Sequence, residues 1–142
     1  MPTRFGSAQW KGDLGQGSGT FTVGKAGYQA PYSAGSRFEE AGGSNPEELI
    51  AAAHASCYSM ALSFMLSLDG HTPISVDTTA QVTIEKVGDG FAITKIKLMT
   101  KGVVPGIDAS MFQDYAQKAK VGCPVSKALS AVPSIELEAT LG

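Results

Sequence analysis

Residues 45–68, NPEELIAAAHASCYSMALSFMLSL, predict one long helix around which the rest of the chain must fold. Asn45 is a suitable N-cap, Pro46 suits the first helical position, and Glu48 stands three residues after the cap, as in a capping box. Ser44 with Glu47 offers an alternative register for the same motif. Asp69-Gly70 is expected to end the helix.

The body of this helix carries no Asp, Glu, Lys or Arg from Leu49 to Leu68, which is typical of a core helix or a membrane span. About 20 residues are long enough to cross a bilayer. However, His54, Cys57 and four serines interrupt the apolar run, and no Lys or Arg flanks it closely. We therefore expect a central helix that is buried in the protein.

The remaining segments predict strands and shorter helices. Short strands are expected at 7–10, 19–23 and 28–33, and 75–87 alternates between apolar and polar residues before a turn at 88–90. In the strand 91–101 the apolar phase slips, which predicts a bulge near Thr94–Lys95. A helix from Asp108 or Ser110 to about Val121, a short helix from Pro124 and a strand over 134–141 complete an α+β fold. We expect a single domain over 1–142, with the long helix packed on antiparallel sheets.

Composition excludes some functions. The 142 residues carry a net charge of −2, so no basic face for nucleic acid is expected. The glycine-rich run at 15–19 lacks the Lys-Ser/Thr and the following helix of a phosphate-binding loop. The first residues hold no apolar run of signal-peptide length, which favours a cytoplasmic location.

The two cysteines are either inert core residues or a redox pair, since a reducing compartment disfavours a structural bridge. Position alone favours packing for Cys57, because a mid-helix thiol needs a nearby cation to become reactive. Cys123 stands at the predicted start of a helix, where a thiol pKa falls. The chain has only two arginines, and Arg37 is the one placed near the long helix, in the loop GSRFEE. It would either pair with Glu39 or Glu40 at the surface or lie over the Cys57 thiolate.

A metal site is another possible role for these residues. His54 and Cys57 form an HxxC motif that could bind a metal together with His71 and Cys123. The remaining spacings match no common zinc pattern, so no metal is expected. His54 would then be a histidine satisfied within a packed interface.

Several stretches together resemble the OsmC/Ohr family of thiol peroxidases. RFEEAGGSNPEELIAAAHASCYSMALS (37–63) and KAKVGCPVSKAL (118–129) are the most specific, and SVDTTA (75–80), GFAITKIKL (90–98) and VPGIDAS (104–110) follow in order between them. The segment KGDLG (11–15) lacks the arginine of the Ohr branch, so the resemblance is to the OsmC (osmotically inducible protein C) branch. It implies an OsmC-like fold in an intertwined homodimer and a role in oxidative and osmotic stress.

The resemblance also implies the chemistry. Cys57 resembles the peroxidatic cysteine, which forms a sulfenic acid, and Cys123 the resolving cysteine, which converts it to a disulfide. Arg37 resembles the arginine that holds the thiolate, and Glu47 the glutamate that orients this arginine. The implied activity is reduction of organic hydroperoxides and hydrogen peroxide. No cofactor is implied, and the implied reductant is a dithiol such as a lipoylated protein.

Geometry adds one expectation to this assignment. Glu47 and Cys57 are ten residues apart, about 15 Å along a helix, so they cannot touch directly. We therefore predict that the site is completed across a homodimer interface. Ile50 and Phe64, with Met60 and Phe38, are expected to form an apolar pocket for an alkyl hydroperoxide. The alternatives are a non-enzymatic small-ligand-binding module or a structural stress protein.

Overall fold

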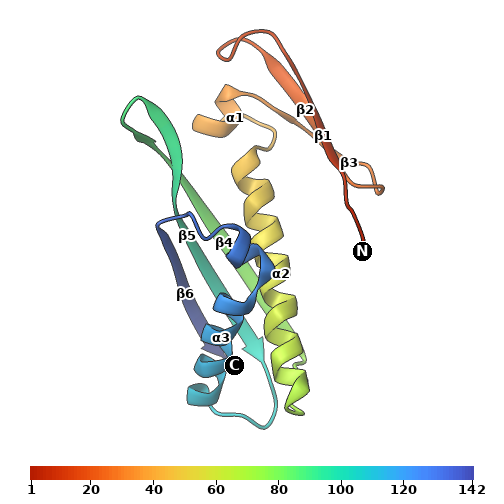
Figure 1. The fold of residues 1–142 in the computed structure, drawn as a ribbon, viewed down its shortest axis with the longest axis vertical. Coiled ribbons are helices and arrows are strands. Elements are labelled where there is room, and N and C mark those ends of the chain that lie inside the picture. The colour runs from red at the N-terminus through yellow and green to blue at the C-terminus, as the bar shows by residue number, and fades with distance from the viewer. The chain divides into compact units, whose positions relative to one another are not determined.

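A computed structural model describes residues 1–142, which divide into two compact units, residues 1–49 and residues 50–142 (Figure 1). The elements follow in the order β1 (Gly6–Lys11), β2 (Ser18–Val23), β3 (Tyr28–Tyr32), α1 (Ala34–Phe38), α2 (Pro46–Leu68), β4 (Ser75–Val87), β5 (Gly90–Val103), α3 (Ala109–Gly122), α4 (Pro124–Ala128) and β6 (Ser134–Leu141). The chain is therefore α+β, as expected. A single domain over 1–142 stays a prediction.

The first unit is an antiparallel sheet with the strand order β1-β2-β3. All three strands were predicted from short apolar patches between glycine turns. The segment after β3 was predicted as a loop, but residues 34–38 form the short helix α1. Ser33 and Ser36 close a capping box at its start: each hydroxyl accepts a hydrogen bond from the other residue's backbone N–H.

The long helix α2 begins at Pro46, and the Asn45 side chain accepts a hydrogen bond of 2.9 Å from the backbone N–H of Glu48. The Glu48 carboxylate does not complete the predicted capping box, because it accepts a hydrogen bond from the Ser44 hydroxyl at 2.6 Å instead. One stripe of α2 is buried, at the helical spacing of four residues: His54, Tyr58, Leu62 and Leu66. Within one chain the helix is completely buried only along this stripe, and burial of its other faces in an assembly stays a prediction.

The opposite stripe of α2 stays exposed, and Met60 and Phe64 have 73% and 63% of their surface accessible. By length and composition α2 could cross a membrane, a test that the core helices of soluble proteins also pass. Ser59 of α2 contacts the sheet of the second unit, where its hydroxyl donates to Thr78 Oγ1 of β4 at 2.8 Å.

The sheet of the second unit has the order β4-β5-β6. β4 and β5 form a hairpin, and Gly88 with φ of +61° supplies the turn conformation that favours glycine. The register shifts where Thr83 pairs with Lys95 and Ile84 pairs with Ile93, which leaves Thr94 as the extra residue of the predicted bulge. β6 runs parallel to β5, so this sheet is mixed and not wholly antiparallel. A helical crossover between two strands permits parallel pairing, and α3 and α4 form that connection.

Both α2 and α3 pack on one face of this sheet. The core between them is formed by side chains from α2, α3, β5 and the loop after it: Tyr58, Leu62, Leu66, Leu98, Val104, Phe112, Ala119 and Cys123. α3 begins at the predicted N-cap Asp108, whose carboxylate accepts from the backbone N–H of Met111 at 2.8 Å. This packing fixes where α3 ends, and therefore where Cys123 lies.

Candidate active site

The two thiols, 66 residues apart in sequence, meet in the second unit. Cys57 lies in the middle of α2 and is partly exposed, whereas Cys123 is completely buried where α3 ends and α4 begins. Neither is in a disulfide, and they are close enough for a thiol–thiol hydrogen bond. The docking of α3 on α2 creates this proximity, which sequence spacing could not predict.

The pKa of the Cys57 thiol is raised within the single chain. Burial is the main cause, and the neighbouring Cys123 adds to it through its hydrogen bond and its charge. The backbone N–H of Val125 donates to the sulfur and acts in the opposite direction. Because no cation acts on this thiol here, a reactive Cys57 needs one from elsewhere.

The pKa of the Cys123 thiol is lowered, the direction expected for a thiol at a helix start. Burial alone would raise the pKa of Cys123, but hydrogen bonds from the backbone N–H of Ser126, from Cys57, from the Ser126 hydroxyl and from the backbone N–H of Val125 outweigh it. Burial, with a contribution from the charge on Cys123, raises the pKa of the neighbouring Tyr58, whose hydroxyl donates to the Ala116 carbonyl at 3.0 Å. Hydrogen bonding thus lowers the pKa of Cys123, whereas burial raises the pKa of Cys57.

The first unit presents Arg37 from the last turn of α1 and not from a loop. Two hydrogen bonds fix α1 to the start of α2. The Ser36 hydroxyl donates to the Ser44 carbonyl at 2.7 Å, and the Asn45 amide donates to the Ser36 carbonyl at 2.9 Å. Arg37 therefore has a defined position in spite of the short helix that carries it.

Arg37 and Glu47 form a bidentate salt bridge. Arg37 Nη2 lies 2.8 Å from Glu47 Oε1, and Nε lies 3.1 Å from Oε1 and 3.2 Å from Oε2. Glu47 is only 6% exposed, so a nearly buried carboxylate fixes the orientation of the guanidinium. A surface salt bridge of Arg37 with Glu39 or Glu40 was one possibility from the sequence. In the structure, the salt-bridge partner of Arg37 is Glu47.

Of the four residues predicted to form one apolar pocket, Phe38 belongs to the first unit and Ile50, Met60 and Phe64 belong to the second. Phe38 lines a cavity of about 240 Å³ together with Arg37, Trp10, Leu14, Tyr32, Ser33, Ala34 and Pro46. Met60 and Phe64 line a groove beside Pro73 and Ile74, and Ile50 lines neither of these hollows. Sequence reasoning missed Trp10 of β1 and Tyr32 of β3, whose ring centroids lie 5.4 Å apart. Their aromatic character in short strands was the available signal.

His54 is completely buried and its Nε2 lies 2.7 Å from the Ser126 hydroxyl. Sequence reasoning missed Ser126, which lies 72 positions from His54 and meets it only because α4 packs on α2. His71, considered above as a fourth metal ligand, instead contacts the Tyr115 ring edge-on. No three His, Cys, Asp or Glu side chains gather as a metal site would require.

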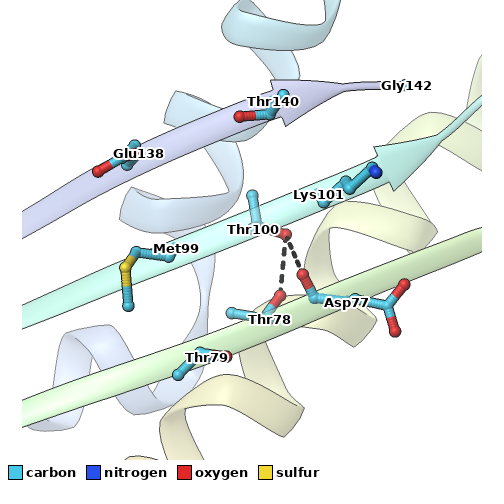
Figure 2. A pocket seen from close by; sticks show the side chains of 9 residues that line it. All are labelled: Asp77, Thr78, Thr79, Met99, Thr100, Lys101, Glu138, Thr140 and Gly142. Carbon is cyan, nitrogen blue, oxygen red and sulfur yellow. Dashed lines mark hydrogen bonds between the residues drawn. The ribbon is translucent and has the colours of Figure 1, made fainter.

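A further hollow of about 590 Å³ lies over the sheet of the second unit and is lined by Asp77, Thr78, Thr79, Met99, Thr100, Lys101, Glu138, Thr140 and Gly142 (Figure 2). Figure 2 shows Thr100 bonded to Thr78 and to the Asp77 carbonyl, at 2.9 and 3.3 Å. Its lining contains no thiol and no arginine. It therefore lacks the groups that peroxide reduction by cysteine requires.

Comparison of the sequence with known proteins identifies close relatives. The chain is 53% identical over 135 residues to peroxiredoxin OsmC of Escherichia coli, which covers 94% of each chain. It is 31% identical over 96 residues to the organic hydroperoxide resistance protein OhrA of Bacillus subtilis, covering 66% of this chain and 65% of the relative.

Solved structures share the fold at low sequence identity. The OsmC-like protein of Mycoplasma pneumoniae matches with a TM-score of 0.74 at 16% identity, over 99% of this chain and 97% of that one. OhrB of Bacillus subtilis matches with a TM-score of 0.71 at 23% identity, over 97% and 98%. The family model described as OsmC-like protein matches residues 39–138. This chain belongs to the OsmC family.

Proposed function

We propose that Cys57 and Cys123 form the redox pair with which this thiol peroxidase reduces organic hydroperoxides and hydrogen peroxide. The observation that carries the proposal is the pair of adjacent, unbridged thiols, one partly exposed and one buried, in the second unit. Relatives named peroxiredoxin and organic hydroperoxide resistance protein support the reaction class.

The reaction begins when the Cys57 thiolate attacks the distal oxygen of the hydroperoxide. The O–O bond breaks, an alcohol leaves after taking up a proton, and Cys57 becomes a sulfenic acid. The Cys123 thiolate then attacks the Cys57 sulfur, the S–O bond breaks, and the hydroxide is protonated to water. The product is a Cys57–Cys123 disulfide, which a dithiol such as a lipoylated protein reduces.

Arg37 is proposed to supply the cation that Cys57 lacks. A guanidinium beside the sulfur would lower the thiol pKa and stabilise the charge on the leaving alkoxide. The bidentate bond to Glu47 holds that guanidinium in one orientation. Phe38 and Arg37 both line the cavity of about 240 Å³ in the first unit, whose apolar side chains suit the alkyl part of a substrate. Ile50, Met60 and Phe64 are proposed to complete the apolar surroundings.

A homodimer is proposed to complete the site. The exposed apolar stripe of α2 that contains Met60 and Phe64 is a surface that a second copy of the chain would cover. Such packing would also bring a second set of Arg37 and Glu47 to the assembly. We place the activity in the cytoplasm during oxidative or osmotic stress, where dithiol reductants keep cysteines reduced.

The test is peroxide consumption by purified variants with a dithiol reductant. Cys57→Ser should abolish turnover of an alkyl hydroperoxide. Cys123→Ser should consume one equivalent and stop as the sulfenic acid, which a dimedone adduct on Cys57 would report by mass spectrometry. Full activity of Cys57→Ser would contradict the proposal and would favour a binding role for the apolar surfaces.

A further inference from the structure

Two aromatic side chains of the first unit pack together in a way that the redox steps above do not use. Trp10 of β1 and Tyr32 of β3 are both partly buried, and their ring centroids lie 5.4 Å apart with the ring planes inclined at 51°. Phe21 of β2 adds a third ring, whose centroid lies 5.9 Å from that of Tyr32. Tilted contacts at these distances are favourable between aromatic rings, so the neighbouring rings hold Tyr32 in place.

Gly19 of β2 permits the contact between Trp10 and Tyr32. In the antiparallel register Gly19 lies opposite Trp10 on one side and opposite Tyr32 on the other, so the three residues share one face of the sheet. A Cβ atom at Gly19 would lie 2.6 Å from Cε1 of Tyr32 and 2.9 Å from Cε3 of Trp10. The missing side chain therefore lets two rings that start two strands apart meet over the middle strand.

These two rings line the same cavity as the arginine proposed to act on the substrate. The cavity has a volume of about 240 Å³, and Arg37 is the only charged residue in its lining. Trp10, Tyr32 and Phe38 contribute aromatic rings to it from three different elements. The Trp10 Nε1–H donates to the Gly12 carbonyl at 3.0 Å, so the one polar atom of the indole already has its partner and the rest of its surface is apolar.

The size and the lining of the cavity together indicate what it would hold. Sites for drug-sized ligands occupy roughly 300–1,000 Å³, so a cavity of about 240 Å³ suits one ring with short substituents and not a long lipid chain. An aryl group would gain ring–ring contacts with Trp10 and Tyr32 that a methyl group cannot make. Arg37 binds Glu47 through Nε and Nη2, which leaves Nη1 outside that salt bridge for the polar end of the ligand.

We propose that Trp10 and Tyr32 are specificity-determining residues, whose rings select hydroperoxides with an aryl group over those with only short alkyl groups. This inference rests on the proposed function, because it takes the cavity that Arg37 lines as the place where the organic part of the substrate binds. Gly19 is the positioning residue for both rings. Its added Cβ would also lie 2.6 Å from the Gln9 carbonyl oxygen and so disturb the sheet itself, which makes the rings and not Gly19 the residues to change.

The first experiment measures binding without turnover. Trp10 is the only tryptophan of the chain, so its fluorescence reports on the cavity. The probes are cumyl alcohol and tert-butanol, which differ only by a phenyl group in place of a methyl group and have no O–O bond to react. We expect a saturable change of Trp10 emission with cumyl alcohol and none with tert-butanol at equal concentration. Tyr32→Leu should weaken the binding of cumyl alcohol about threefold to tenfold, because a ring contact is lost.

Two variants control for the fold and for the chemical change. Tyr32→Phe keeps the ring and should bind cumyl alcohol like the unmodified chain. Tyr28→Leu makes the same change on the same strand, at a residue that is 73% exposed and does not line the cavity, and should also leave binding unchanged.

Two results of this titration would overturn the inference. One is equal binding of cumyl alcohol by Tyr32→Leu and Tyr28→Leu. The other is a response of the unmodified chain that does not distinguish the two alcohols, and this comparison needs no variant to fold. The titration requires no peroxidase activity, so its result is independent of the proposed function.

The second experiment measures turnover with a dithiol reductant in excess. Cumene hydroperoxide and tert-butyl hydroperoxide differ by the same exchange of phenyl for methyl, and kcat/KM should be higher for cumene hydroperoxide. Tyr32→Leu should lower this preference about threefold to tenfold, and Tyr32→Phe should keep it. The loss should appear in KM and not in kcat, because Tyr32 contacts the organic group and not the reacting atoms. An unchanged preference in Tyr32→Leu would overturn the inference, whereas an unmodified protein that consumes neither hydroperoxide would contradict the proposed function itself.

Discussion

The salt bridge between Arg37 and Glu47 is the most strongly defined contact among the proposed site residues. A bidentate bond to a nearly buried carboxylate removes most of the rotational freedom of a guanidinium. If Arg37 acts on the thiolate and on the leaving alkoxide, its orientation matters as much as its charge. Glu47 then contributes to catalysis without touching the substrate.

Glu47→Gln should therefore lower kcat/KM for an alkyl hydroperoxide by about 10- to 100-fold, because Arg37 loses its ionic partner and its fixed geometry. Glu48→Gln is the matched control: the neighbouring carboxylate is exposed and accepts a hydrogen bond from Ser44. Initial rates of peroxide loss with a dithiol in excess measure both variants. Equal rates for Glu47→Gln and the unmodified protein would remove Glu47 from the site.

Residue identities predicted part of this arrangement and missed the rest for a physical reason. The chemistry of helix starts pointed to Cys123 and the scarcity of arginines to Arg37, whereas position alone favoured packing for Cys57, whose catalytic role only the family resemblance implied. The contact between His54 and Ser126 was not predictable, because nothing near His54 in sequence indicates which element packs against it. The thiol–thiol proximity depends equally on how α3 docks, which is a property of the tertiary fold.

At the level of the elements, strong periodicity was the reliable guide. The alternation in 75–87 gave β4, and the apolar phase slip gave the bulge at Thr94 of β5. The helix α1 was missed because five residues with glycine and serine carry too little periodicity to be recognised. The parallel pairing of β6 was missed because a strand's direction depends on its connection and not on its own residues.

The docking of α3 onto β5 depends on Gly102. A Cβ atom at this position would lie 2.6 Å from Cε2 and 2.7 Å from Cζ of the buried Phe112 ring, closer than real contacts allow. Gly102→Ala should therefore force the ring to move and lower the free energy of unfolding by about 1–3 kcal/mol. Because α3 positions Cys123, we also expect slower disulfide formation after peroxide treatment.

Gly90→Ala is the control for this prediction, since it lies on the same strand and an added Cβ would meet nothing within 4 Å. Urea denaturation followed by circular dichroism measures both variants. A Gly102→Ala protein as stable as Gly90→Ala would mean that α3 docks with more freedom than these contacts indicate.

For the whole molecule, the decisive feature is the distribution of apolar surface on α2. One stripe of the helix is fully buried against the sheet and α3, and the other leaves Met60 and Phe64 largely exposed next to Ile74. Soluble proteins rarely leave a contiguous apolar groove of this kind uncovered. The sequence predicted a central helix buried in the protein, and a second copy of the chain would complete that burial.

The dimer proposed to cover this stripe should be sensitive to a charge placed in it. Phe64→Glu should convert a dimer to a monomer, because burying an unpaired carboxylate in an apolar interface costs several kcal/mol. Val121→Glu introduces the same charge at an equally exposed apolar residue of α3 and should leave the mass unchanged. Sedimentation equilibrium gives the mass of each variant. A monomeric unmodified protein with full activity would rule out this assembly, and a Phe64→Glu dimer would place the interface on another surface.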